Sequence, residues 1–373
     1  MTIVQCAEGG QGGGQTYLLN LALHIDRSRY EPVFIFAGES GIAGCLAEKG
    51  IEVYEIPSLR MFDLAGFLRL MGIFLRIKPF ILQTHGARMS LYARSAARLA
   101  GCHRVITTLH VSLKSYDIPF LKKHFYFLAE RLTSRFASLA VAVTDYLKDD
   151  YAGYAGFPRD RISVIYNGVD TVRYAPSADS RRKIREEIGA GEEQFIVGCV
   201  GRMVKGKGFE YVLEALDISL KKGRPIKAVF AGDGPLRPGL EDQARSRGIA
   251  AEVKFLGNRK NVGEILCALD ALVLPSKTEG MPYILLEAMA CGCPVVTTNA
   301  GGISAVTDNG RYALIVPYAS PEAVYQSLLK LMDDRGFASG LSGFARSMVV
   351  EKFSIKKSIG LLCMLYDKLN NVR

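Results

Sequence analysis

Short runs of apolar residues alternate with segments of helical spacing along most of the chain. The runs are bounded by polar or turn-forming residues, as in strands buried in a parallel sheet, and the segments between them repeat apolar residues at intervals of three and four. The alternation predicts parallel sheets covered by helices. The expected strands lie at residues 2–7, 32–38, 51–56, 80–85, 104–110, 139–144, 162–167, 194–201, 226–232, 252–257, 271–276, 294–299 and 313–317.

A polar, turn-rich stretch, NGVDTVRYAPSADSRRKIREEIGAGEE, interrupts this pattern after Tyr166. A chain of 373 residues also exceeds one ordinary core. We therefore predict an α/β protein with two Rossmann-like, doubly wound domains that face a central cleft. The expected parts are a first domain (1–170), a linker with a charged helix (171–190), a second domain (191–354) and a terminal helix (355–373).

A glycine-rich loop, VGRMVKGKGFEYVLEAL, follows one expected strand and leads into a helix. Gly201, Gly206 and Lys207 have the spacing of a P-loop, but Gly208 stands where that loop has the Ser or Thr that binds Mg²⁺. A P-loop NTPase is therefore disfavoured. Arg202 and Lys207 instead add two cations to a helix N-terminus, which suits a diphosphate. The alternative is a solvated turn without a ligand.

A second stretch, SKTEGMPYILLEAMACGCPVV, also begins at a strand end. Glu279 lies in the turn, and Pro282 fits the first turn of the next helix. Glu287 falls among apolar residues, where a buried carboxylate needs partners such as the hydroxyls of a sugar or a ribose. The alternative places Glu287 on an exposed helix face. Paired glutamates also occur in glycoside hydrolases, but their separation does not follow from this sequence.

Glycines crowd the first strand–helix connection, EGGQGGGQTYLLNLA, which indicates backbone that approaches an anionic or crowded partner. The G-x-G-x-x-G fingerprint of a dinucleotide site is broken here by Gln15 or by Tyr17, depending on the starting glycine. Glu39, after the second expected strand, keeps a NAD-dependent oxidoreductase as an alternative. The glycines of interest are Gly12, Gly13 and Gly14.

Polar residues also end other expected strands. His85 and His110 follow strands of the first domain, and Asp233 follows a strand of the second. Because ligands of open α/β sheets bind beyond the carboxyl ends of the strands, all three are candidates for a site. His110 is the better histidine candidate, and Asp233 has a turn-forming role as its alternative.

The net charge of +10, from 47 basic and 37 acidic residues, suits an anionic partner. No zinc, helix-turn-helix or RNA-binding signature accompanies it, so we expect no nucleic-acid partner. The eight cysteines form no Cys-x-x-Cys pair and are expected to be reduced thiols of a cytoplasmic protein. Met1–Ala7 has no basic leader, and charges interrupt the most apolar segment, 64–82, so neither a signal peptide nor a spanning helix is expected.

Two apolar segments carry spaced basic residues. Arg69 and Arg76 interrupt residues 64–82, and Lys122 and Lys123 lie in FLKKHFYFLAERLTSRF, residues 120–136. Basic amphipathic helices bind anionic lipid, so we predict weak peripheral association with the inner face of a membrane. The alternative is an ordinary helix with its charged face in water.

Together these motifs resemble the family 4 (group 1) glycosyltransferases, retaining enzymes with the GT-B fold. The resemblance covers nearly the whole chain, and its most specific piece is Glu279, seven residues, then Glu287 and AMACGCPVV, with Arg202 and Lys207 upstream. The motifs that carry it are GGQGGGQTYLLNLA, TLH, VTDYLKDDY, VIYNGVD, GRMVKGKG, AGDGP, FLGN and EGMPYILLEAMACGCPVVTTNAGG.

The resemblance implies a hexosyltransferase that moves a sugar from a nucleotide-sugar donor to a glycan, lipid-linked or small-molecule acceptor in cell-surface polysaccharide or glycolipid synthesis. A UDP-sugar is favoured, with a GDP-sugar as an option. No metal or other cofactor is implied, because Arg202 and Lys207 would neutralise the leaving diphosphate. The sequence lacks the Asp-x-Asp motif of metal-dependent transferases.

The resemblance also assigns roles. Glu279 would contact the donor sugar, Glu287 would accept hydrogen bonds from the ribose, and His110 would touch the donor sugar from the first domain. The catalytic set is therefore His110, Arg202, Lys207 and Glu279. The other donor-side residues are Gly13, Gly14, Gly201, Asp233, Gly280, Met281 and Pro282, and the acceptor-side candidates are Gly12 and His85.

The resemblance implies a front-face displacement in which the leaving phosphate takes the acceptor's proton. One motif departs from the family: Gly301 and Gly302 are followed by Ile303, Ser304 and Ala305, without the usual Glu. A carboxylate role in that loop is therefore in doubt, although the two glycines still permit backbone to approach a phosphate. A sugar-nucleotide-binding protein without catalysis is the remaining alternative, and turnover of a donor separates the two.

Overall fold

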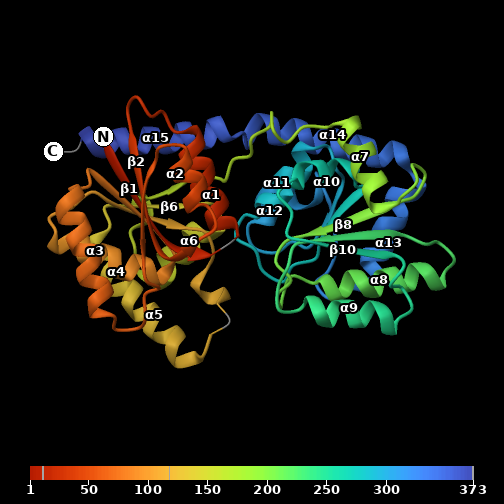
Figure 1. The fold of residues 1–373 in the computed structure, drawn as a ribbon, viewed down its shortest axis with the longest axis horizontal. Coiled ribbons are helices and arrows are strands. Elements are labelled where there is room, and N and C mark those ends of the chain that lie inside the picture. Colours follow the sequence, from red (N-terminus) through yellow and green to blue (C-terminus); the bar gives the residue numbers. More distant parts are fainter. Residues whose placement is uncertain (11, 117, 372–373) are drawn as a thin grey trace. The chain divides into compact units, whose positions relative to one another are not determined.

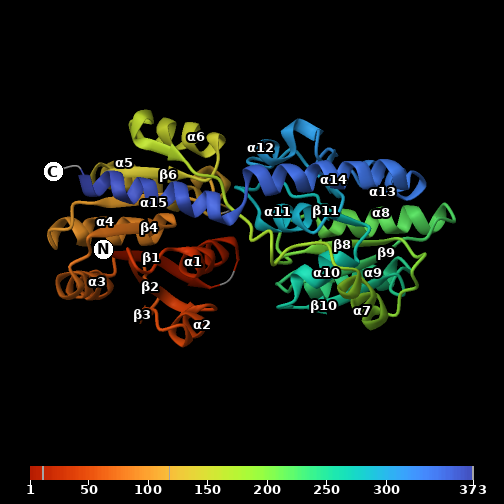
Figure 2. The same cartoon turned by 90° about the horizontal axis from the view of Figure 1, so that it is seen from above.

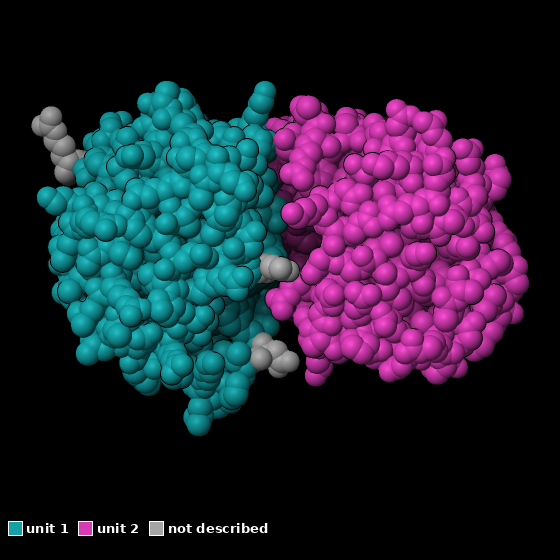
Figure 3. Space-filling view, in the orientation of Figure 1, with its two compact units in different colours: residues 1–167, 355–373 teal, residues 168–354 magenta. Residues whose placement is uncertain are grey.

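The computed structural model describes residues 1–10, 12–116 and 118–371. The chain divides into two compact units, coloured in Figure 3: residues 1–167 with 355–373, and residues 168–354. The charged helix expected within 171–190 is α7 (Ala178–Ile188), which belongs to the second unit. The terminal helix is α15 (Ile355–Asn371), which belongs to the first, and residues 372–373 of the expected helix lie outside the described ones.

The first unit is a seven-stranded parallel sheet in the order β3-β2-β1-β4-β5-β6-β7 (Figure 1). All seven apolar runs predicted for this part of the chain are strands. The central strands are the most buried, as in β4 and β5, where every residue is buried, whereas the edge strands β3 and β7 are partly exposed. The strands are β1 (Thr2–Gly10), β2 (Glu31–Ser40), β3 (Glu52–Ile56), β4 (Ile81–His85), β5 (Val105–Leu109), β6 (Leu139–Ala142) and β7 (Ile162–Val164).

Helices α3, α4 and α5 pack in a row in the first unit, and α15 packs beside α1 (Figures 1 and 2). Buried Tyr366 fixes α15 to the sheet, because its hydroxyl donates to Oε1 of Gln83 and accepts from Nε2 of Gln5 at 3.3 Å. The helices are α1 (Gly13–His24), α2 (Ala43–Glu48), α3 (Leu64–Ile77), α4 (Ala87–Leu99), α5 (Phe120–Thr133) and α6 (Asp145–Ala155), with 3₁₀ turns at Leu113–Ser115, Ser134–Phe136 and Arg159–Arg161.

The second unit is a six-stranded parallel sheet in the order β10-β9-β8-β11-β12-β13, and all six predicted runs are strands. Its strands are β8 (Ile196–Val200), β9 (Lys227–Ala231), β10 (Val253–Gly257), β11 (Ala271–Leu274), β12 (Val295–Thr297) and β13 (Leu314–Ile315). Its other helices are α8 (Phe209–Lys221), α9 (Arg237–Ser246), α10 (Val262–Ala268), α11 (Tyr283–Ala290), α12 (Ile303–Thr307), α13 (Pro321–Asp333) and α14 (Arg335–Lys352), with a 3₁₀ turn at Asp308–Gly310.

The helices of the second unit begin and pack as their sequence dictates. Phe209, Val212, Leu213 and Leu216 of α8 share one face and are buried against the sheet. Helix α11 is buried nearly all round, and it begins at Tyr283, so Pro282 stands at the N-cap instead of in the first turn. The eight cysteines are all free thiols, as expected.

The strand orders locate a switch point in each sheet, where the chain reverses its direction of winding. Such points are the usual ligand sites of open α/β sheets, because the loops after the two central strands diverge there. In the first sheet the switch lies between β1 and β4, and in the second it lies between β8 and β11. Within the part of the chain that the structure describes, no helix is long and apolar enough to cross a membrane.

Candidate active site

The loop between β8 and α8 is held against the loop after β9. The N–H of Gly201 donates to the carbonyl of Ala231 at 2.9 Å, and that of Met203 donates to the carbonyl of Asp233 at 2.9 Å. A Cβ at Gly232 would lie 2.0 Å from the carbonyl oxygen of Gly201, and its φ of +130° favours glycine. The backbone of the Arg202–Lys207 loop is therefore fixed at the switch point.

Gly208 shows why the loop lacks the hydroxyl of a P-loop. This residue is the N-cap of α8 with a φ of +78°, and a Cβ there would lie 2.3 Å from the carbonyl oxygen of Pro275. A Ser or Thr would need both the positive φ and that space, so the close approach of the two loops excludes it. The sequence supplies glycine because the β8 and β11 loops are in contact.

Lys207 and Glu279 come together at this switch point from opposite sides. The Lys207 amine donates to Oε1 of Glu279 at 2.6 Å, and the Ser276 hydroxyl donates to the same oxygen at 2.8 Å. The Glu279 side chain is 9% exposed, and that of Lys207 is 32% exposed. Arg202 is exposed and has no ion pair with any described residue. The loop thus presents one paired cation, Lys207, and two exposed cations, Arg202 and Lys205, that have no ion pair with any described residue.

The glycine pair after β12 packs on the backbone of Glu279. A Cβ at Gly301 would lie 2.0 Å from the Glu279 carbonyl oxygen, and the Gly302 N–H donates to that oxygen at 3.3 Å. The positive φ of Gly301, +56°, and the lack of a Cβ there let this residue hold the turn that carries Glu279. Ser304 donates to the Gly301 carbonyl at 3.1 Å, so the altered motif still closes its own turn.

Glu287 is buried, with 8% exposure, so it does not lie on an exposed helix face. The hydroxyl of Tyr174 donates a hydrogen bond to its carboxylate. Burial raises the pKa of Glu287 to about 7, although the bond from Tyr174 and the charge of Arg173 act in the opposite direction. The group therefore titrates near neutral pH, where binding of further hydroxyl donors would favour the charged form.

The remaining predicted donor-side residues of this unit have structural partners. Asp233 accepts from the N–H of Gly234 at 2.7 Å and pairs with Arg237 at 3.2 Å, so the turn-forming alternative describes it in this structure. Gly280 and Met281 are buried in the turn that leads into α11.

In the first unit, the predicted glycines form the start of α1. Gly12 is the N-cap with a φ of +120°, and its carbonyl accepts from the N–H groups of Gln15 and Thr16. Gly13 and Gly14 are the first helical residues. The side chain of Gln15 turns back to donate to the carbonyl of Glu8 at 3.0 Å. Gln11, part of the same motif, lies outside the described residues.

His85 and His110 are joined in a hydrogen-bonded chain that starts at buried Gln5. Gln5 donates through Nε2 to Oε1 of Gln83 at 3.2 Å, so its own Oε1 accepts from Nε2 of His85 at 2.8 Å. His85 therefore carries its proton on Nε2, and its Nδ1 accepts from Nε2 of His110 at 3.0 Å. Nδ1 of His110 is left as an acceptor, with no hydrogen-bond partner among the described residues.

Burial keeps both imidazoles neutral. It lowers the pKa of His85 well below the usual value and lowers that of His110 to about 4. The hydrogen-bonded chain from Gln5 fixes the tautomer of each ring. His110 therefore acts as a hydrogen-bond acceptor at neutral pH, not as a cation.

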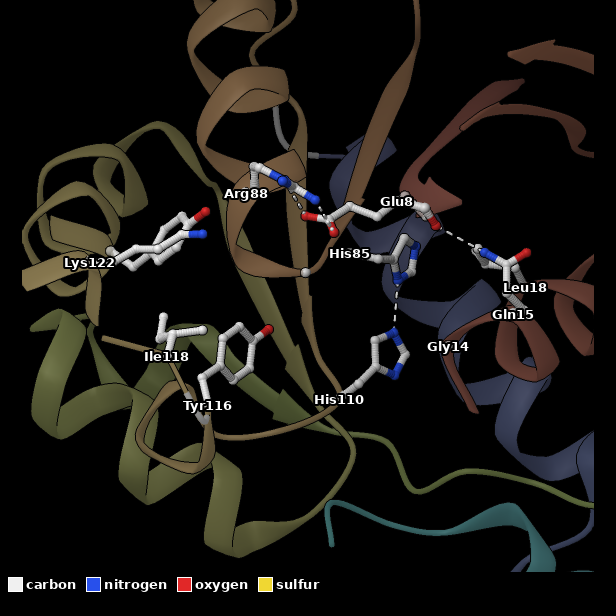
Figure 4. A pocket seen from close by; sticks show the side chains of 13 residues that line it. Glu8, Gly14, Gln15, Leu18, His85, Arg88, His110, Tyr116, Ile118 and Lys122 are labelled. Carbon is white, nitrogen blue, oxygen red and sulfur yellow. Dashed lines mark hydrogen bonds and ion pairs between the residues drawn. The ribbon is translucent and has the colours of Figure 1, made fainter. Parts of the chain in front are cut away.

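A cavity of about 320 Å³ brings Gly14, His85 and His110 together in the first unit (Figure 4). Most of the other polar residues that line this cavity were not predicted from the sequence. Arg88 donates to both carboxylate oxygens of Glu8, at 3.1 and 2.8 Å, across 80 positions of sequence. Glu8 directly follows the strand expected at residues 2–7 and lies near the carboxyl end of β1, so the strand-end rule that selected the histidines could have found it. The other residues that line the cavity are Ala7, Gln15, Leu18, Gly86, Tyr116, Ile118, Lys122 and Tyr126.

Two family models match the chain. The model for glycosyl transferases group 1 matches residues 180–348, and the model for glycosyltransferase family 4 matches residues 11–173. Together they cover most of the sequence and fall on the two halves that contain the two sheets.

Known proteins with similar sequences are glycosyltransferases. The chain is 29% identical over 229 residues to an uncharacterized glycosyltransferase from Methanocaldococcus jannaschii, a match that covers 60% of this chain and 58% of that protein. It is 26% identical over 341 residues to the UDP-Gal:α-D-GlcNAc-diphosphoundecaprenol α-1,3-galactosyltransferase of Escherichia coli, covering 88% of this chain and 87% of that protein.

The fold is similar to that of a solved protein in complex with a nucleotide sugar. HepE from Anabaena, solved with UDP-glucose, superposes with a TM-score of 0.88 at 20% identity, covering 99% of this chain and 100% of that one. This likeness confirms the predicted fold class of two parallel-sheet α/β domains.

Proposed function

Because the chain belongs to the family 4 (group 1) glycosyltransferases and has their GT-B fold, we propose that it is a retaining hexosyltransferase that uses a nucleotide-sugar donor. The observation that carries the proposal is the contact between Lys207 and Glu279 at the switch point of the second sheet, with Arg202 exposed on the same loop as Lys207. Cations on the loop that precedes a helix suit the diphosphate of such a donor.

The donor is a UDP-sugar in this proposal. Support comes from the E. coli relative, whose name specifies UDP-Gal, and from the Anabaena structure, which contains UDP-glucose. Arg202, which has no ion pair with any described residue, binds one phosphate, and the Lys207 amine, bonded to Glu279 in this structure, binds the other. Glu287 accepts hydrogen bonds from the ribose, and these replace solvent that its burial excludes.

The chemistry requires stabilisation of charge on the departing diphosphate. In the proposed step the acceptor oxygen forms a bond to the anomeric carbon on the face from which the diphosphate leaves, so configuration is retained. The bond from that carbon to the phosphate oxygen breaks, and the acceptor's proton passes to a phosphate oxygen. Fixed cations at Arg202 and Lys207 do what a metal ion does in other transferases, and no metal cofactor is needed. Glu279, still bonded to Ser276, accepts from a sugar hydroxyl.

A thermal-shift screen against UDP-, GDP- and ADP-sugars tests the donor. Ligands that bind the folded state raise its stability, by about 2.7 kcal/mol at a hundred times Kd. We expect UDP-sugars to stabilise the protein most, and release of UDP in the presence of acceptor to distinguish an enzyme from a non-catalytic sugar-nucleotide-binding protein. Stabilisation by none of the three classes would contradict the proposal.

The acceptor belongs to cell-surface polysaccharide or glycolipid synthesis in this proposal, and a membrane surface presents it. Large apolar side chains are exposed on α3 and α5 and before α3, including Phe62, Phe120 and Leu121 at 80, 71 and 81% exposure. The rings of Phe62 and Phe125, whose centroids lie 5.4 Å apart, link the two segments. Arg69 and Arg76 add positive charge, which attracts anionic lipid.

Vesicle binding checks this surface. At low salt the protein should co-sediment with phosphatidylglycerol vesicles and not with phosphatidylcholine vesicles, and Phe120→Ser with Leu121→Ser should weaken the binding because apolar area is lost. A membrane role would be contradicted if the double variant co-sedimented with anionic vesicles as well as the unaltered protein does, or if the unaltered protein did not co-sediment at all.

A further inference from the structure

The cavity of the first unit is lined by both charged and apolar side chains. The Glu8–Arg88 pair lies along one side of the cavity, Tyr116 and Ile118 lie across from it, and His110 also lines the cavity (Figure 4). Burial raises the pKa of Tyr116 to about 12, so its hydroxyl stays protonated at neutral pH. Such a cavity fits a ligand with both a charged group and apolar surface.

Among the described residues that line the cavity, positive charges outnumber negative ones. Arg88 and Lys122 accompany a single described carboxylate, that of Glu8, and Arg88 already forms a bidentate pair with it. Lys122 has no ion pair with any described residue, and its amine points into the cavity (Figure 4). The Arg88 and Glu8 side chains are 34 and 37% exposed, so the pair is open to exchange with an incoming anion.

The first turn of α5 joins the cavity to the exposed apolar side chains of Phe120 and Leu121. Lys122 lines the cavity, while Phe120 and Leu121, directly before it, are 71 and 81% exposed. The one acidic residue of α5, Glu130, is buried against Arg94 with both carboxylate oxygens 2.7 Å from its guanidinium nitrogens, so it does not offset Lys122. A cation at the cavity therefore adjoins an apolar edge.

We propose that this cavity binds the phosphate of an amphiphilic acceptor, a sugar joined through phosphate to an apolar chain. Lys122 and Arg88 hold the phosphate, Glu8 competes with it for Arg88, and the chain leaves along Phe120 and Leu121. Arg and Lys both bind phosphate well, Arg as a planar fork and Lys as a point charge. The inference deepens the proposed function, because it names the acceptor class of that reaction.

Binding of n-decyl phosphate to the intact protein, measured by calorimetry without any donor, tests the proposal. Lys122→Ala should weaken binding by about tenfold, because a charge-assisted contact is lost. Lys123→Ala is the matched control: it removes the same charge from the same turn, but the Lys123 amine bonds the Lys114 carbonyl at 2.7 Å and does not line the cavity. Its affinity should stay close to that of the unaltered protein.

Glu8→Gln provides a change in the opposite direction. Removing the carboxylate frees Arg88, so the affinity for decyl phosphate should rise severalfold, which damage to the fold would not cause. Equal losses in the Lys122 and Lys123 variants, or weaker binding by Glu8→Gln, would overturn the proposal.

Two further probes separate the contribution of the phosphate to binding from that of the apolar chain. Inorganic phosphate and the uncharged n-decyl glucoside should each bind at least about tenfold more weakly than decyl phosphate, since each lacks one half of the ligand. Equal binding of decyl glucoside would overturn the phosphate site, and equal binding of inorganic phosphate would overturn the amphiphile. Because no donor is present, these outcomes are independent of the UDP-sugar screen, and either proposal can fail while the other stands.

Discussion

Lys207→Ala is expected to lower the rate of sugar transfer by about 10²- to 10³-fold, the usual effect of removing one group that stabilises transition-state charge. Lys207 lies on the loop between β8 and α8, and its amine is 2.6 Å from Oε1 of Glu279. The matched control is Lys205→Ala, which removes an exposed cation from the same loop. Steady-state rates of UDP release with acceptor are the measurement, and the control should retain most of its activity.

A loss of folding must be separated from a loss of charge. The Glu279 side chain is only 9% exposed, so removal of Lys207 leaves a nearly buried carboxylate without its cation. The double variant Lys207→Met with Glu279→Gln removes both charges and should recover thermal stability without recovering transfer. If it recovered the rate as well, or if Lys205→Ala lost as much as Lys207→Ala, the role of Lys207 would be wrong.

The affinity for UDP-glucose is expected to rise by up to about tenfold from pH 6 to pH 8 in the unaltered protein. Burial raises the pKa of Glu287 to about 7 in the free protein, so the carboxyl is mostly protonated at pH 6. Ribose hydroxyls that donate to the carboxylate favour its charged form, and binding therefore releases a proton. Calorimetry in buffers of different ionisation enthalpy measures that release.

The ionisation of Glu287 also makes the stability of the free protein depend on pH, in the direction opposite to the affinity. A carboxyl whose pKa is raised on folding contributes stability that is fully present below its unfolded pKa and is lost as the pH rises through about 7. Glu287→Gln should therefore weaken the pH dependence both of the stability of the free protein and of its affinity for UDP-glucose. Tyr174→Phe should move the transition to higher pH, because the Tyr174 hydroxyl lowers the pKa of Glu287. An unchanged profile in Glu287→Gln would assign the pH dependence to another group.

The strands and the positions of the loops could be predicted from sequence because local patterns encode them. Most strands are runs of largely apolar residues, and the central ones are buried on both faces. The Arg202–Lys207 loop stands between such a strand and an amphipathic helix. The prediction of two doubly wound domains followed from that alternation and is confirmed by the strand orders. The strand-end rule also selected Glu279, His85 and His110.

Contacts that join distant positions could not be predicted in this way. Tyr174 and Glu287 are separated by most of the second unit, and no pattern around either one announces their hydrogen bond. Likewise Arg88 lies 80 positions from Glu8, and only the adjacency of β1 and β4 brings them together. The sequence indicated only that Gly301 permits backbone to approach a phosphate, and its packing on the Glu279 carbonyl could not be foreseen. Tertiary contacts decided these cases, and local propensity carries no information about them.

Transfer by metal-stripped protein tests the central claim most directly, that side-chain cations at Arg202 and Lys207 stabilise the leaving diphosphate. The initial rate would be measured with excess EDTA and again after addition of Mg²⁺ or Mn²⁺. The account predicts the same rate in both conditions, and a large loss in Lys207→Ala under either. A rate that vanishes in EDTA and returns only with a divalent cation would contradict it.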